Sequence, residues 1–111
     1  MDSSSIDDVT ATEARDGVHL AQTVSGERAS LQHVRIEPGA TVEPHDHENE
    51  QIGWLASGSL AFDIEGTEVV VEAGDAYVVP GGETHGVENR GEETAVGVEA
   101  FVPPRANPPW E

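Results

Sequence analysis

Short apolar segments separated by turn residues run along the chain. Segments rich in Val, Ile, Leu and Thr are expected to form strands at 18–24, 31–37, 52–57, 60–65, 68–72, 76–79 and 94–102. Gly, Pro and acidic residues occupy the gaps between them and favour tight turns. No stretch of a dozen residues shows a helical period. The pattern therefore predicts an all-β fold, either a sandwich or a barrel.

The last apolar segment has two different faces, because side chains alternate along a strand. One face carries Val96, Val98, Ala100 and Val102, and the other carries Gly97, Glu99 and Phe101. If the Val face packs on a sheet or on a partner, Glu99 points into the interior. If the Val face is the core, Glu99 points to solvent. A buried carboxylate is costly unless it is paired or used in chemistry, so the orientation matters, and the sequence leaves it open.

The chain has 111 residues, which fits one domain. Residues 1–12 are acidic and Ser-rich and are expected to be a flexible tail. The domain is expected to span 13–111 and to end in an extended, Pro-rich tail at about 103–111, in which Trp110 packs on the domain or on a partner subunit. There is no signal-peptide pattern and no apolar run of membrane-spanning length, so we expect a cytoplasmic protein without a membrane partner.

Charge separates this chain from average proteins. It carries 22 acidic residues, five Arg and no Lys, for a formal net charge of −17. Such a surface repels nucleic acid, which is therefore not an expected partner. Self-repulsion of this strength is reduced by salt. We interpret the composition as a halophilic adaptation to a salty cytoplasm, as in haloarchaea.

The chemistry concentrates in residues 39–58. The chain has no Cys, so a metal site must use His, carboxylate or amide ligands. His45 and His47 are two residues apart, which on a strand places both imidazoles on one face. Gln51 has the same parity, whereas Glu48 and Glu50 have the opposite parity and are expected to face solvent. The sequence therefore predicts His45, His47 and Gln51 as neighbouring metal ligands.

A second stretch, 74–89, supplies one more imidazole. Pro80, Gly81 and Gly82 form a turn that leads His85 onto the next strand. Together these ligands predict a site for one divalent metal ion, for which Zn, Ni, Fe, Mn and Co are all candidates. Neutral ligands leave the ion its full charge, which favours Lewis-acid chemistry and weakens binding somewhat. His19 and His33 have no motif around them and are interpreted as structural or surface residues. For His33, a position lining an interior cavity is the alternative.

These two stretches resemble the two motifs of the cupin superfamily. The first motif is matched by Gly39, His45, His47, Gln51 and Gly58, with Gln51 standing where Glu is usual, and the second by Gly74, Pro80, Gly82, His85 and Asn89. The resemblance implies a single antiparallel jelly-roll barrel with a metal at its mouth, and often a dimer. Ile52 and Trp54, which have parity opposite to Gln51, are expected to form an apolar patch that a homodimer covers.

A narrower resemblance is to the KdgF-like pectin-degradation cupins, which convert 4,5-unsaturated uronates into linear keto forms. It rests on the HxHxxEQ pattern and on an acidic residue followed by Phe and Pro-x-Arg. The resemblance implies metal ligands at His45, His47, Gln51 and His85, and catalytic and substrate-binding residues at Glu99, Phe101 and Arg105. Glu99 departs from the Asp of those proteins.

The resulting hypothesis is a metal-assisted tautomerase or isomerase acting on a small, anionic sugar acid. Glu99 would transfer protons and Arg105 would bind the substrate carboxylate, beside Phe101. Two alternatives remain open. One is a cupin-type dioxygenase that uses Fe, Mn or Ni, and the other is a metal-dependent small-molecule binding protein that is not an enzyme.

Overall fold

The computed structural model describes residues 1–105 and is built almost entirely from strands. Besides one short 3₁₀ turn, η1 (Ile6–Asp8), the described residues form β1 (Thr12–Arg15), β2 (Val18–Ser25), β3 (Ser30–Ile36), β4 (Thr41–His45), β5 (Glu50–Ser57), β6 (Ser59–Ile64), β7 (Thr67–Glu72), β8 (Ala76–Val79), β9 (His85–Glu88) and β10 (Ala95–Val102). The all-β prediction is therefore confirmed. Each predicted strand segment coincides with an observed strand to within two residues.

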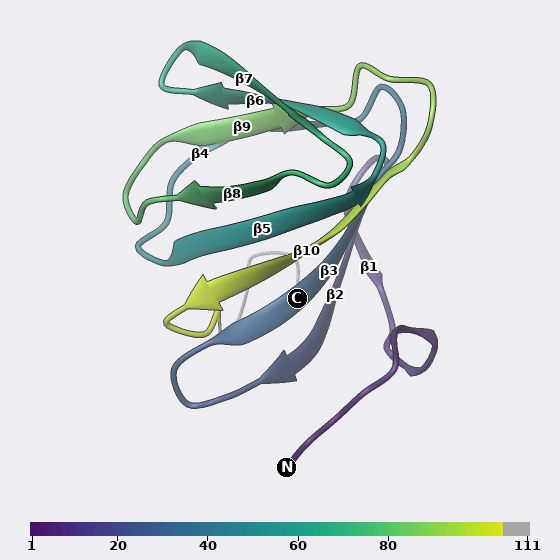
Figure 1. Cartoon of the computed structure of the whole chain (residues 1–111), viewed down its shortest axis with the longest axis vertical. Coiled ribbons are helices and arrows are strands. Elements are labelled where there is room, and N and C mark those ends of the chain that lie inside the picture. Colours follow the sequence, from purple (N-terminus) through teal and green to yellow (C-terminus); the bar gives the residue numbers. More distant parts are fainter. Residues whose placement is uncertain (106–111) are drawn as a thin grey trace.

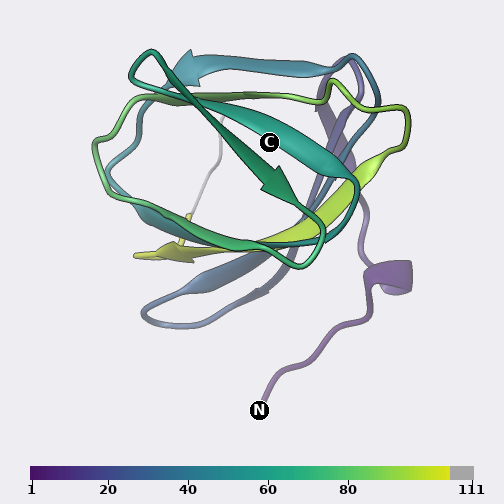
Figure 2. The same cartoon turned by 45° about the horizontal axis from the view of Figure 1, so that its top comes forward.

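The strands form two antiparallel sheets that face each other. One sheet has the order β1-β2-β3-β10-β5-β8 and the other the order β4-β9-β6-β7. Figure 1 shows the two sheets separated along the long axis of the molecule, and Figure 2 shows them curving around a shared interior. This is the jelly-roll barrel expected from the cupin motifs. Because β5 lies in one sheet and β4 and β9 in the other, the two motif stretches meet across the barrel.

Strands β1, β4 and β9 were not among the segments predicted from apolar runs. Strand β1 reads TEAR and β4 reads TVEPH, so neither carries a continuous apolar signal. Both lie at the edge of their sheet, where one long side of the strand has no neighbouring strand. Strand β9 is only four residues long and offers Val87 as its single aliphatic side chain. Their strand structure depends on pairing with neighbours rather than on local preference.

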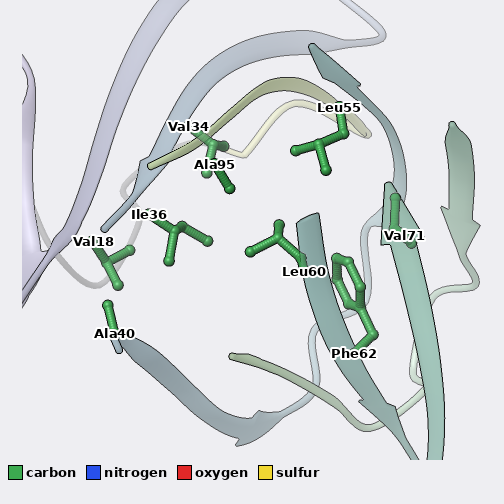
Figure 3. Close-up of a cluster of buried hydrophobic side chains, with 9 residues drawn as sticks. All are labelled: Val18, Val34, Ile36, Ala40, Leu55, Leu60, Phe62, Val71 and Ala95. Atoms are coloured by element: carbon green, nitrogen blue, oxygen red, sulfur yellow. The ribbon is translucent and has the colours of Figure 1, made fainter. Parts of the chain in front are cut away.

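The apolar core occupies one end of the barrel interior. It is formed by Val18, Val34, Ile36, Ala40, Leu55, Leu60, Phe62, Val71 and Ala95, whose side chains converge from both sheets in Figure 3. In the first sheet, Val34, Gly97 and Leu55 form one inward-facing row across β3, β10 and β5. Moving along β10 by two residues changes the chemistry of the row, because Glu99 is the next inward position.

The outer face of the first sheet is apolar as well. Ile52, Trp54, Val78 and Val102 are between 40% and 58% exposed there. This confirms that Ile52 and Trp54 point away from the interior. The burial pattern of β10 also shows which of its two faces points inward: the face that carries Gly97, Glu99 and Phe101 is buried. Among the described residues, no helix is long and apolar enough to cross a membrane.

The structure describes the start of the chain in full and its end as far as Arg105. Residues 1–8 are exposed, and the Ser4 hydroxyl donates to the Thr23 carbonyl oxygen at 2.8 Å. The sheet begins at Thr12, which pairs with Leu20 of β2. The flexibility of residues 1–12 stays a prediction. At the other end, Trp110 and the last part of the proposed tail lie outside the described residues.

Candidate metal centre

Three imidazoles converge at the end of the barrel opposite the apolar core. Their ring centroids are 4.5 Å apart for His45 and His85, 5.0 Å for His47 and His85, and 5.8 Å for His45 and His47. One nitrogen from each ring lies within 4.8 Å of the other two. His45 ends β4 and stands opposite His85, which begins β9. The convergence predicted from the sequence is therefore present.

The expectation that strand periodicity places His47 beside His45 is wrong. Strand β4 ends at His45, and His47 lies in the loop between β4 and β5. Strand periodicity therefore does not place the two rings together. The loop does so by folding against the turn that precedes His85, where the Gly82 amide donates to the His47 carbonyl oxygen at 2.8 Å. Gly82 has a φ of +81°, a conformation that glycine adopts with little strain.

The backbone fixes the tautomer of all three rings. Each Nδ1 lies 2.9–3.0 Å from a carbonyl oxygen two residues away: Glu43 for His45, Asn49 for His47 and Glu83 for His85. A carbonyl oxygen only accepts hydrogen bonds, so each Nδ1 must carry the proton. Nε2 is then the ring nitrogen that can offer a lone pair to a metal ion. This is the arrangement that metal-ligating histidines use.

Gln51 completes the donor set from β5. Its side chain is buried, and its Oε1 lies 3.1 Å from His47 Nε2. Its Nε2 donates a hydrogen bond to the Glu99 carboxylate, which turns the carbonyl oxygen toward the histidines. Glu48 and Glu50 are exposed, as predicted. Gln51 is the second residue of β5, the strand that follows the His47 loop, so a strand period shared with His45 and His47 does not explain its position.

This donor set fits a divalent cation. Three neutral imidazoles and one amide oxygen are ligands that Zn, Ni, Fe, Mn and Co accept. Burial lowers the pKa of His85, and the charges of His45, His47 and Arg105 add to this effect, whereas the hydrogen bond to the Glu83 backbone opposes it. The lowered pKa favours the neutral form of His85, which is the form that binds a metal.

Glu99 lies next to this cluster and is 8% exposed. It receives three side-chain hydrogen bonds: one from Gln51, one from the Tyr77 hydroxyl at 2.7 Å, and one from Gln32 Nε2 at 3.2 Å. These donors compensate for the cost of burying a carboxylate. Of the two orientations that the sequence left open, the inward one is correct.

Phe101 and Arg105 close the other side of the site. Phe101 is fully buried, and its ring centroid lies 5.8 Å from that of His47. The Arg105 guanidinium carbon lies 5.2 Å from the centre of the Phe101 ring, within the range of a cation–π contact. Burial lowers the pKa of Arg105, and the Glu99 charge opposes that change.

Arg105 follows the end of β10 and is positioned through its backbone. Its amide donates to the Ser30 hydroxyl at 3.0 Å, and its carbonyl oxygen accepts from Gln22 Nε2 at 2.7 Å. Asn49, in the loop that carries His47, donates to the Pro103 carbonyl oxygen at 2.6 Å. The segment after β10 is therefore attached both to the first sheet and to the metal-binding loop.

These groups share one cavity of about 430 Å³. Its lining includes every predicted site residue except His47, namely His45, Gln51, His85, Glu99, Phe101 and Arg105. It also includes Gln32 and Tyr77, which the sequence did not single out. Gln32 and Tyr77 were missed because they have no motif. Only the strand register shows that they stand in the row of Glu99. His19 and His33 lie outside this cavity, and His19 Nε2 instead lies 2.6 Å from a Glu37 oxygen.

Comparison with known proteins agrees with the fold. Residues 32–101 match the family described as "Cupin domain". The chain belongs to the cupin family. It is 35% identical over 104 residues to the pectin degradation protein KdgF of Dickeya dadantii, covering 92% of this chain and 94% of that protein.

A second relative and a solved structure are also similar to this chain. An H2HPP isomerase of Bacillus subtilis is 41% identical over 69 residues, covering 62% of this chain and 29% of that protein. The solved structure of KdgF from a Halomonas species superimposes with a TM-score of 0.86 at 23% identity, covering 96% of both chains. At that identity, the structural likeness supports the fold.

Proposed function

We propose that this cupin is a metal-dependent isomerase that ketonises unsaturated uronates or similar small acidic sugars. The observation that carries the proposal is the shared cavity, which is lined by His45, His85, Glu99 and Arg105 and lies beside the cluster of three histidines. The similarity to a pectin degradation protein and to an isomerase supports the same reaction class. The substrate is small enough for a cavity of about 430 Å³.

The metal ligands in this proposal are His45, His47, His85 and Gln51, which would hold one divalent ion. A divalent ion on neutral ligands supplies Lewis acidity, which stabilises negative charge developing on a substrate oxygen. The chain's own contribution is to fix the ligands beforehand. It does so with the backbone hydrogen bonds to the three Nδ1 atoms and the Glu99 contact to the Gln51 amide.

Arg105 is the proposed anchor for the substrate carboxylate. Its guanidinium presents parallel N–H donors that match a carboxylate in a bidentate pair. The chain has a net charge of −17, so a cation at the cavity is needed to offset the general repulsion of an anionic substrate. The Phe101 ring beneath the guanidinium restricts its orientation and offers an apolar surface to the sugar ring.

Glu99 is the proposed proton carrier. Ketonisation of a cyclic 4,5-unsaturated uronate breaks the bond between C1 and the ring oxygen, with loss of the C1 hydroxyl proton. The electron pair passes through the C4–C5 double bond, and C4 takes up a proton. A carboxylate that accepts the first proton and returns one to C4 completes the reaction without net proton change. Glu99 fits this role because it is buried beside the metal ligands.

One unpaired acceptor supports a hydroxyl-rich substrate. Gln32 Oε1 is buried and has no hydrogen-bond partner within the part of the chain that the structure describes. Gln32 lines the cavity, and its Nε2 is already bonded to Glu99. An unsatisfied buried acceptor is costly, and a sugar hydroxyl is a donor of suitable size. A sugar acid therefore satisfies this group better than an aromatic or purely carboxylic substrate would.

We also propose that the active form is a homodimer. The exposed apolar side chains Ile52, Trp54, Val78 and Val102 gather on the outer face of the six-stranded sheet, which is the side opposite to the cavity. Contiguous apolar surface of this kind favours association. A second copy would bury it without obstructing the site, because these side chains point away from the interior.

The test is the loss of conjugated-acid ultraviolet absorbance from a 4,5-unsaturated uronate, with metal-loaded protein in molar KCl. We expect faster loss than in the protein-free reaction, and loss of this acceleration in Glu99→Gln. Oxygen consumption with an enolic or aromatic substrate instead would indicate a dioxygenase. Thermal stabilisation by the uronate without turnover would indicate a binding protein. Either result would overturn the isomerase proposal.

A further inference from the structure

The row of inward positions at Glu99 contains a glycine in the middle of the sheet. Gly53 of β5 stands opposite Glu99 of β10 on one side and opposite Tyr77 of β8 on the other. The neighbouring inward positions of β5 are Gln51 and Leu55, both of which carry buried side chains. Glycine inside a strand weakens it, and it often marks a place where another group approaches closely.

The group that approaches Gly53 is the phenol of Tyr77. A Cβ placed on Gly53 would lie 2.2 Å from Tyr77 Cζ, 2.4 Å from its hydroxyl oxygen and 2.6 Å from Cε2. The ring therefore lies across β5, in the volume that any other residue at position 53 would occupy. It reaches over one complete strand, and its hydroxyl donates to Glu99 Oε2 at 2.7 Å.

Two further contacts show that this arrangement is constrained. The Tyr77 ring packs against Phe62 from the opposite sheet, with centroids 4.9 Å apart. The Glu99 oxygen that accepts from Tyr77 also accepts from Gln51. The phenol, the carboxylate and the carboxamide thus form one chain of hydrogen bonds that ends at Gln51 Oε1, beside His47.

We propose that Tyr77 is a positioning residue that holds the Glu99 carboxylate in its working orientation, and that Gly53 is the residue that makes this contact possible. The inference rests on the proposed function, in which Glu99 transfers protons. A carboxylate bonded on one oxygen by both Tyr77 and Gln51 is restrained in rotation. Its second oxygen, which among residues 1–105 is hydrogen-bonded only by Gln32, is the one left for the substrate.

The first test does not depend on activity. Tyr77 is the single Tyr of the chain, so tyrosinate absorbance reports on it alone. Burial raises the pKa of Tyr77 above its ordinary value, and the Glu99 charge and hydrogen bond raise it further. In molar KCl, folded wild-type protein is expected to show no tyrosinate at about pH 11, where an ordinary Tyr is largely ionised. Circular dichroism at the same pH verifies that the protein is folded.

The variants are chosen to separate the contact from the packing. Tyr77→Phe keeps the ring and removes only the hydroxyl. Gly53→Ala keeps both polar groups and displaces the ring, which is a movable side-chain end, so the sheet is expected to survive. Gly26→Ala is the matched control, because a Cβ there would meet only the Ala29 carbonyl oxygen at 3.4 Å, in the turn between β2 and β3.

We expect Tyr77→Phe to lower kcat for the uronate roughly tenfold or more, with KM changed by less than about twofold, as for loss of a hydrogen bond to a charged group. Gly53→Ala should lower kcat similarly and should bring tyrosinate formation down to an ordinary pH. The double variant should have a kcat no lower than that of the slower single variant, because both substitutions remove the same contact between Tyr77 and Glu99. Gly26→Ala should match wild type.

Full kcat in Tyr77→Phe, or tyrosinate formation at an ordinary pH in wild type, would overturn the inference. A double variant whose fold-loss in kcat equals the product of the two single losses would overturn it as well. Failure of the proposed function looks different. In that case wild type itself would not turn over the uronate, while a suppressed tyrosinate signal in wild type and its appearance in Gly53→Ala would still establish that Gly53 allows the buried position of the Tyr77 ring.

Discussion

The Gln51 side chain donates to the Glu99 carboxylate, and this contact joins the candidate metal centre to the candidate proton carrier. The amide has two different ends, and Glu99 accepts only from the nitrogen end. The oxygen is thereby directed to His47. An acidic residue at position 51, which is usual in the cupin motif, would place two carboxylates in contact here. Gln51 and Glu99 are therefore best understood as a pair.

Gln51→Glu tests this pairing. The change adds an anionic ligand, which strengthens metal binding, but it removes the donor to Glu99 and places a like charge beside it. We expect tighter metal binding in a competitive chelator titration and a fall in kcat of roughly tenfold to a hundredfold. Unchanged turnover in a metal-loaded Gln51→Glu protein would show that the amide is not needed for the reaction.

Arg105→Lys tests the substrate anchor while keeping the positive charge. Lysine cannot form the bidentate pair, and it cannot stack on Phe101 as a planar guanidinium does. We expect KM for the uronate to rise about tenfold, while the circular dichroism and the metal content match wild type. An unchanged KM would mean that the substrate carboxylate binds elsewhere in the cavity.

Salt dependence tests the interpretation of the composition. A net charge of −17 with no Lys creates repulsion that counter-ions screen. We expect the melting temperature to rise steeply between dilute buffer and molar KCl. An uncharged osmolyte at matched osmolality serves as the control, because it leaves charge repulsion in place. Equal melting temperatures in low and molar KCl would remove the halophilic interpretation.

Trp54→Glu tests the proposed dimer. Trp54 is half exposed on the outer face of the six-stranded sheet, beside Ile52 and Val78. A charge at this position should prevent burial of the apolar face, so light scattering in molar KCl should change from dimer to monomer. Glu48→Gln, at an exposed position in the loop before β5, is a surface control expected to stay dimeric. A wild-type monomer would contradict the proposal directly.

The candidate ligand residues could be predicted because they stand at the fixed spacing of the two motifs. His45, His47, His85 and Gln51 stand at fixed distances in two short stretches, and the structure brings them together. The orientation of Glu99 could not be predicted in the same way. Its strand has apolar residues on both faces, and the more continuous Val face points outward because the sheet is apolar on its outer side.

The supporting residues required the strand register. Tyr77, Gly53 and Gln32 lie far from Glu99 in the sequence and carry no motif. They become neighbours only when β8, β5, β10 and β3 pair in one particular alignment. Pairing of this kind is set by the whole sheet, so local sequence patterns do not reveal it.

The most direct measurement of the central claim is proton NMR of a 4,5-unsaturated uronate in D₂O with metal-loaded protein in molar KCl. The account predicts that the vinyl signal at C4 disappears faster than without protein. It also predicts a linear keto product that carries deuterium at C4, with the acceleration lost in Glu99→Gln. A vinyl signal that decays at the protein-free rate, with metal confirmed in the sample, would contradict the assignment of this cupin as a uronate isomerase.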